Sequence, residues 1–90
     1  MKGYETAFDI CKIVNKDDKI RENELLIYPG GWKNDFFSIF IKNFEEYDDN
    51  VKYACDKIKE VIDQCDEWTF IKDSYDDRVN QVEVHAKRME

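Results

Sequence analysis

The sequence predicts an α+β fold for a single domain spanning residues 1–90, with helices on one face of a mainly antiparallel sheet. Three observations favour this class: a long segment with helical apolar periodicity, two β-rich segments before it, and two further strand-like segments after it. With a shorter helix at the start, the element order is approximately α-β-β-α-β-β. The chain is 42% hydrophobic and rich in Phe, Tyr and Trp, so it can bury one core. No linker or repeat divides it.

The first predicted element is a helix over residues 4–14. Its apolar residues recur at three- and four-residue steps and therefore share one helical face. These residues are Tyr4, Ala7, Phe8, Cys11 and Val14. The next segment, residues 15–23, is polar and charged, and is interpreted as an exposed connection.

Two strands are predicted next, and the second is ambiguous. The β-rich run at residues 24–28 is expected to end in a tight turn at Pro29, Gly30 and Gly31. Residues 36–42 have the Phe and Ile content of a strand, although their phenylalanines also fit a helical face. We favour the strand. Because both of its faces are apolar, it would be central and covered on both sides, or would leave one face for a partner.

The long helix is predicted over residues 49–67. Seven apolar side chains fall within about a third of its circumference, the width of a core-facing stripe. They are Val51, Ala54, Cys55, Ile58, Val61, Ile62 and Cys65. The side chain of Asp48, Asp49 or Asn50 can cap its start. Its other end is less well matched, because two acidic residues, at positions 66 and 67, lie where the helix dipole favours a cation.

The chain is predicted to end in an antiparallel hairpin. Its strands cover residues 68–73 and 79–87, and the turn covers residues 74–78. In the second strand Val82, Val84 and Ala86 alternate with four polar residues, which gives it one inward and one outward face. The outward residues are Gln81, Glu83, His85 and Lys87.

The acidity of the chain is concentrated in one region. The formal net charge is −7, yet residues 45–77 alone hold twelve acidic against four basic residues. Such a balance argues against direct binding to nucleic acid or to an anionic membrane, because both require clustered Lys and Arg. The sequence therefore predicts a basic protein surface as partner.

Four acidic residues form a carboxylate row on the predicted long helix, opposite its apolar stripe. The row consists of Asp56, Glu60, Asp63 and Glu67. Their i, i+4, i+7, i+11 spacing places them on one solvent-facing side. Successive carboxylates lie about 5–6 Å apart along the axis, comparable in scale to phosphates along a nucleic-acid strand. Three nearby lysines can neutralise part of the row, so a purely solvating role is the alternative. These lysines are Lys52, Lys57 and Lys59.

No catalytic, cofactor or metal site is predicted. The potential zinc ligands are Cys11, Cys55, Cys65 and His85, and they include no close pair of the kind that zinc sites use. The cysteines lie on apolar faces, which disfavours a reactive thiolate. The aspartates at 73, 76 and 77 lack the glycine and distal glutamate of a calcium loop. The glycine pair at 30 and 31 lacks the Lys-Ser/Thr of a phosphate-binding loop.

The expected location is the cytoplasm. The number of cysteines is odd, and residues 1–14 already contain Glu5 and Asp9, so no secretory leader is expected. The longest apolar run, around residues 36–41, is too short to span a membrane and is interrupted by Ser38.

The function predicted from these features is that of a non-enzymatic inhibitor that occupies a basic, nucleic-acid-binding surface of a partner. The predicted contacts are the carboxylate row together with Tyr53, Asp73, Asp76 and Asp77. Trp32, Tyr47 and Tyr75 are further candidates, because Trp and Tyr dominate binding hot spots.

In size, charge and composition the chain is similar to small acidic proteins that phages use against host defences, including anti-CRISPR proteins, with which it shares no motif. The similarity is one of type and implies an inhibitory role. The alternative is a structural or assembly module, in which the strand at residues 36–41 or a sheet edge pairs with another copy or with a partner.

Overall fold

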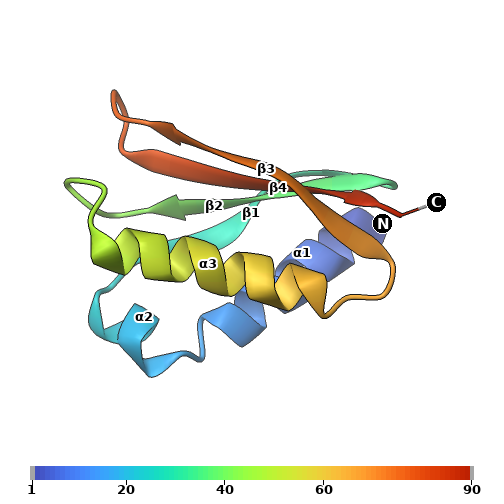
Figure 1. The fold of residues 1–90 in the computed structure, drawn as a ribbon, viewed down its shortest axis with the longest axis horizontal. Coiled ribbons are helices and arrows are strands. Elements are labelled where there is room, and N and C mark those ends of the chain that lie inside the picture. Colours follow the sequence, from blue (N-terminus) through green and yellow to red (C-terminus); the bar gives the residue numbers. More distant parts are fainter. Residues whose placement is uncertain (1, 90) are drawn as a thin grey trace.

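A computed structural model describes residues 2–89, in which three helices cover one face of a four-stranded antiparallel sheet (Figure 1). The elements are α1 (Lys2–Val14), α2 (Asp18–Glu22), β1 (Leu26–Lys33), β2 (Phe36–Lys42), α3 (Asp49–Asp63), β3 (Trp68–Asp76) and β4 (Gln81–Arg88). The strands lie in the order β1-β2-β4-β3, and every neighbouring pair is antiparallel. The predicted fold class is confirmed.

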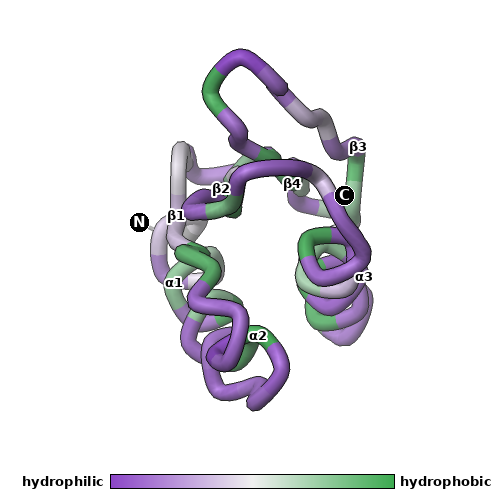
Figure 2. The backbone as a smooth tube through the Cα atoms, turned by 90° about the vertical axis from the view of Figure 1, so that its left-hand side faces the viewer, coloured by the Kyte–Doolittle hydropathy of each residue, from purple (hydrophilic) through white to green (hydrophobic). Residues whose placement is uncertain are grey.

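The core lies between the helices and the side of the sheet that faces them. Seen end-on, α1 and α3 lie side by side beneath the sheet, and no helix covers its opposite face (Figure 2). The inner strand β2 contributes Phe37, Ile39 and Ile41, whose side chains are completely buried. The predicted inward set of β4, Val82, Val84 and Ala86, is also buried. The whole apolar contact layer is therefore on one side of the sheet.

The buried face of α1 is rotated about the helix axis relative to the predicted face, so that it includes Ile10. Ala7, Ile10, Cys11 and Val14 are buried, whereas Tyr4 and Phe8 are exposed at its flank. The Tyr4 ring packs on Phe8 and edge-on against Trp32 of β1, at centroid distances of 5.9 and 4.7 Å. Placing Tyr4 and Phe8 in the core is therefore wrong.

The segment interpreted as an exposed connection contains the short helix α2. The Asp17 side chain accepts a hydrogen bond from the Ile20 N–H at 3.2 Å and so caps the helix. Ile20 is buried against the core. A five-residue helix with a single apolar residue has no periodicity that a sequence could reveal.

The expected turn at Pro29, Gly30 and Gly31 is wrong. Strand β1 continues through these residues with a bulge between Pro29 and Gly31, and the chain reverses at residues 34–35. The Phe40 ring lies against Gly30 so closely that a Cβ there would collide with it. The glycine therefore makes room for a neighbouring ring rather than for a reversal of the chain.

Strand β2 is confirmed, and it is central: β1 and β4 hydrogen-bond to its two sides. Both of its edges are used, so it cannot pair with another copy. Strand pairing through residues 36–41 is therefore wrong. The outer strands of the sheet are β1 and β3, and in β1 the Ile27 carbonyl oxygen already accepts a hydrogen bond from the Asn15 side-chain amide at 3.0 Å. Of the two alternatives for the faces of β2, cover by helices on both sides is wrong, because the helices lie on one side of the sheet (Figure 2). That the other face serves a partner stays a prediction.

Helix α3 carries six of the seven residues of the predicted stripe but ends at Asp63, four residues early, so that Cys65 lies beyond it. Asp48 caps its start by accepting hydrogen bonds from the N–H groups of Asn50 and Val51 at 3.0 and 3.1 Å. Its last turn contains no basic residue, so nothing offsets the negative end of the helix dipole. Trp68 is buried at the start of β3, which requires the chain to leave the helix before it.

The final hairpin is confirmed. Strand β3 continues three residues beyond the predicted end at residue 73, and β4 begins at Gln81, two residues later than predicted. No helix within residues 2–89 is long and apolar enough to cross a membrane.

Replacing Gly3 by Ala tests the packing of α1 on the sheet. On helix propensity alone, the change should stabilise the protein by about 0.5–1 kcal/mol. Gly3 is buried, however, and a Cβ there would collide with the carbonyl oxygen of Lys33 and approach that of Phe36 to 2.8 Å. We expect Gly3→Ala to lower the free energy of unfolding by about 1–3 kcal/mol in urea denaturation. A gain in stability would contradict this packing.

Candidate partner-binding surfaces

Two loops at one end of the sheet, with the residues that directly flank them, together carry six carboxylates. One is the connection from β2 to α3, and the other is the turn between β3 and β4. The Asn80 side-chain amide donates a hydrogen bond to the carbonyl oxygen of Glu45 at 3.0 Å and so ties the two loops together. We call this region the acidic end. It consists of Glu45, Glu46, Asp48, Asp49, Asp76 and Asp77.

Two exposed tyrosines connect the loops of the acidic end. The rings of Tyr47 and Tyr75 lie 5.1 Å apart, and Phe44 packs on Tyr75 at 6.1 Å. The two tyrosines remain 41% and 40% exposed. Both were contact candidates from the sequence, and the fold brings them together from positions 28 residues apart. They form an aromatic surface among the carboxylates.

A surface hollow opens beside these loops. Its walls combine carboxylates, Asn side chains and an apolar base. It is lined by Asn23, Leu25, Asn43, Phe44, Glu45, Glu46, Asp48, Asn50 and Val51. Carboxylate and amide oxygens accept hydrogen bonds, and an apolar base can contact the stem of a long basic side chain. The hollow is chemically suited to a lysine or an arginine.

The carboxylate row is shorter than predicted. Asp56 pairs with Lys52 at 3.0 Å and Glu60 with Lys57 at 3.9 Å, both on α3. Asp63 forms no ion pair within residues 2–89. Glu67 lies beyond the helix, 3.6 Å from Arg88 at the opposite end of the sheet. A row of four carboxylates on one helix is therefore wrong, because Glu67 lies beyond α3. The expected partial neutralisation by lysines is confirmed at Asp56 and Glu60.

Tyr53 is held by an intramolecular contact. Its hydroxyl donates a hydrogen bond to the Asp17 carboxylate at 2.7 Å, and the Lys19 ammonium lies 4.5 Å from its ring centroid. This hydrogen bond lowers the pKa of Asp17 and raises the pKa of Tyr53. Tyr53 joins α3 to the cap of α2.

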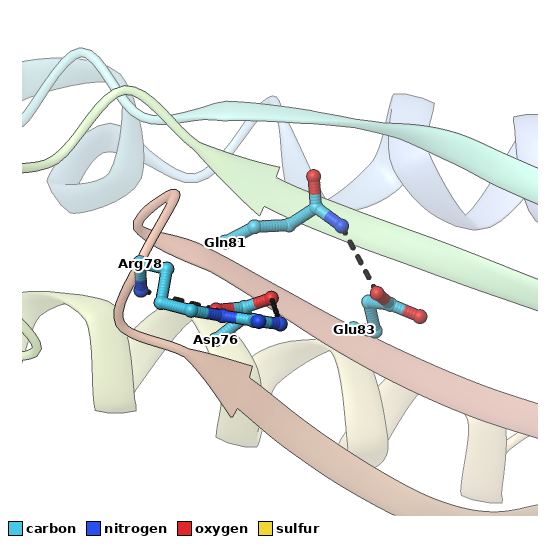
Figure 3. Close-up of polar contacts among 4 residues, drawn as sticks. All are labelled: Asp76, Arg78, Gln81 and Glu83. Atoms are coloured by element: carbon cyan, nitrogen blue, oxygen red, sulfur yellow. Dashed lines mark hydrogen bonds and ion pairs between the residues drawn. The ribbon is translucent and has the colours of Figure 1, made fainter.

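The three predicted aspartates of the last hairpin differ in their surroundings. Asp73 pairs with Lys59 and accepts a contact from the Cys55 thiol at 3.6 Å. The backbone N–H and the guanidinium of Arg78 donate hydrogen bonds to the Asp76 carboxylate at 3.0–3.1 Å (Figure 3). These hydrogen bonds lower the pKa of the Asp76 carboxyl. Asp77 forms no ion pair within the described part of the chain.

The fold therefore does not gather the predicted contact residues into one surface. Of the predicted carboxylates, Asp63 and Asp77 are unpaired among the described residues, and they lie on different elements. Sequence reasoning missed the carboxylates that precede α3, although they were counted in the acidic region. Their signal was the density of acids at residues 45–49, immediately before a capped helix.

The thiols are poorly suited to catalysis or metal binding. Burial raises the pKa of Cys11 to about 12 and that of Cys55 to about 11, and it also raises the pKa of the half-buried Cys65. His85 is paired with Glu83 at 3.2 Å. Across residues 2–89, no group of three or more His, Cys, Asp or Glu side chains is arranged to hold a metal ion.

Comparisons of the chain with protein-family models, with curated proteins and with solved structures find no match.

Thiol labelling tests the burial of the cysteines. With 5,5′-dithiobis(2-nitrobenzoate) at pH 8, we expect the native protein to react slowly at Cys65 and not at Cys11 or Cys55, because buried, protonated thiols are poor nucleophiles. In urea all three should react within minutes. Rapid labelling of native Cys65→Ala would contradict this arrangement.

The Asp17–Tyr53 contact predicts a pH window of stability. The lowered pKa of Asp17 contributes stability above the ordinary aspartate pKa, and this is lost as the pH falls through the lowered value. The raised pKa of Tyr53 contributes stability below the ordinary tyrosine pKa, and this is lost as the pH rises through the raised value.

We therefore expect Tyr53→Phe to be less stable than the wild type between about pH 5 and pH 9, with the difference shrinking outside both limits. Urea denaturation at a series of pH values measures it. A difference that does not depend on pH would mean that the ring packing of Tyr53, and not its hydroxyl, carries the effect.

Proposed function

We propose that this domain is a non-enzymatic binding protein whose acidic end engages a basic surface of a partner protein. The observation that carries the proposal is the pairing state of its carboxylates. Glu45, Glu46, Asp49 and Asp77 form no ion pair within residues 2–89, whereas Asp56 and Glu60 of the row already have lysine partners. Unpaired carboxylates remain available to a cationic ligand, and paired ones have to lose a partner first.

The surroundings of these carboxylates support a protein as the ligand. Tyr47 and Tyr75 offer exposed rings beside the charges, and tyrosine is enriched among residues that dominate protein interfaces. The neighbouring hollow, with Glu45 and Glu46 in its wall, can take one lysine or arginine side chain of the partner. The rings and carboxylates can supply binding affinity, and the hollow can fix the position of the partner on this surface.

The finer proposal is that the partner surface normally binds nucleic acid, so that the domain inhibits by occupying it. This is the mode of action implied by the similarity in type to acidic anti-defence proteins of phages. Carboxylates at a capped helix start and an adjoining turn would stand in for phosphates. The affinity should then fall as the salt concentration rises.

Charge reversal can separate the acidic end from the row. A partner captured by the wild-type domain is identified, purified, and titrated with Glu45→Lys/Glu46→Lys/Asp77→Lys. We expect at least about a 30-fold loss of affinity, the scale of a hot-spot cluster. The matched control, Asp56→Lys/Glu60→Lys/Asp63→Lys, carries the same change in charge and should lose much less. Nucleic acid bound to the partner should be released as the wild-type domain is added.

The same two variants can also contradict the proposal that the acidic end is the contact surface. If the control loses as much affinity as the acidic-end variant, binding depends on net charge and no localised surface exists. If the control alone loses affinity, the row is the contact surface. Circular dichroism must show that both variants remain folded.

A further inference from the structure

The sheet face that the helices leave uncovered has an organised pattern of side chains. The cross-strand pairs place one row as Lys33, Phe36, Lys87 and Thr69, and the next row as Gly31, Ser38, His85 and Lys72. Both rows lie near the turn between β1 and β2. We call them the basic rows. These residues lie on the face opposite the core, because they alternate along the strands with the buried residues that face the helices.

The basic rows differ in charge from the rest of the chain. They contain three lysines and a histidine but no carboxylate, in a chain of net charge −7. None of Lys33, Lys72 and Lys87 forms an ion pair within the described residues. The adjoining row on this face contains Glu83, which accepts a hydrogen bond from Gln81 at 3.0 Å (Figure 3) and whose other carboxylate oxygen lies 3.2 Å from the His85 imidazole. The lysines are free to bind an anion.

The Phe36 ring lies between Lys33 and Lys87, and further aromatic rings lie in a neighbouring row. The Phe36 ring is half-buried and lies 5.9 Å from the His85 imidazole. Gly31 and Gly30 have no side chain to rise above β1, and the Phe40 ring fills the space over Gly30, 5.8 Å from Tyr28. The result is a low platform in which the Phe36 ring lies between lysines, and the rings of Tyr28 and Phe40 lie in the following row, which also contains Glu83.

Two adjoining hollows give this platform depth. One is lined by Asp35, Phe36, Thr69, Lys87, Arg88 and Met89. The other is lined by Lys33, Asn34, Asp35 and Arg88. Asp35 is the one carboxylate in either lining, against three basic side chains. A planar group that enters the first hollow contacts Phe36 while an attached anion reaches Lys33 or Lys87.

We propose that the basic rows bind single-stranded nucleic acid, with phosphates on Lys33, Lys72 and Lys87 and a base stacked on Phe36. A single strand offers both charges and free base faces, and stacking on an aromatic side chain is sequence-tolerant. A duplex keeps its base faces inside the stack and would leave Phe36 unused. An acidic peptide matches the lysines but not the ring. A second copy placed face to face would oppose lysine to lysine.

This inference goes beyond the proposed function, because it concerns the opposite end of the sheet. It also revises the expectation that the net charge excludes nucleic acid.

Fluorescence anisotropy with labelled oligothymidylate of about twelve nucleotides at low salt tests the proposal. We expect saturable binding to the wild type. Lys33→Glu/Lys72→Glu/Lys87→Glu should weaken it at least about tenfold and reduce the slope of log K against log salt by about 2, at roughly 0.7 per phosphate contact. The control Lys12→Glu/Lys16→Glu/Arg21→Glu makes the same charge change on the helix side and should weaken binding by less than about threefold.

Phe36→Leu tests stacking separately from charge. The leucine keeps an apolar side chain at the position, and loss of stacking should weaken oligothymidylate binding about fivefold or more. An abasic strand of the same length should bind less tightly than oligothymidylate and should not distinguish Phe36→Leu from the wild type.

Three results would overturn the proposal: no binding to oligothymidylate, equal losses in the two triple variants, or competition by duplex or polyglutamate as strong as by the single strand. If polyglutamate competes as strongly as the single strand, the ligand of the basic rows is an acidic peptide instead. The acidic-end variant should bind oligothymidylate at least as tightly as the wild type, so failure here is distinguishable from failure of the proposed function.

Discussion

The burial of one face of β2 beneath α1 and α3 is the interaction on which the rest of the structure depends. Phe37, Ile39 and Ile41 are completely buried, and each such side chain contributes about 1.5–3 kcal/mol relative to exposure. Their sum is comparable to the net stability of a small domain, roughly 5–15 kcal/mol. Because β2 also pairs with strands on both sides, it holds β1 and β4 in register. Loss of this layer would dismantle both candidate surfaces together.

Concentrating the core on one side has a consequence for the other side. A sheet of four strands presents as many side chains to solvent as to the helices, and nothing in the apolar layer restricts their chemistry. The same holds at the strand ends, where the loops before α3 and after β3 need only satisfy their backbones. The Asp48 cap and the Asn80 amide do this. Charge is therefore free to differ from one surface to the next.

Elements whose periodicity is local could be predicted from the sequence. The stripe of α3 and the alternation of β4 each lie within one element, and both are as expected. Gly30 was misinterpreted because its role is set by Phe40, ten residues later and on another strand. The early end of α3 reflects competition with the burial of Trp68 in the core. Neither the contact of Phe40 with Gly30 nor the burial of Trp68 can be recognised from a window of neighbouring residues.

The candidate surfaces were less predictable for the same reason. The carboxylate row followed from helical spacing, and its lysine partners within α3 were anticipated. Asp73 and Tyr53 are less available to a partner because Asp73 pairs with Lys59 and Tyr53 donates a hydrogen bond to Asp17, and in each pair the two residues lie in different parts of the chain. The basic rows could not be predicted because they combine side chains from four strands. The register between strands cannot be read from the sequence of any single strand.

Net charge is a poor guide to either surface, because screening acts over a shorter distance than the molecule is long. At physiological ionic strength, exposed charges interact over about 8 Å. Strand β4 begins beside the acidic end and reaches the nearer basic row at His85 after four residues, roughly 13 Å, and the farther one at Lys87 after six, roughly 20 Å at 3.3 Å per residue. The molecule is 36 Å along its longest axis. A ligand at the basic rows therefore experiences mainly Lys33, Lys72 and Lys87, and a ligand at the opposite end experiences mainly carboxylates. The sign of the whole chain excludes neither.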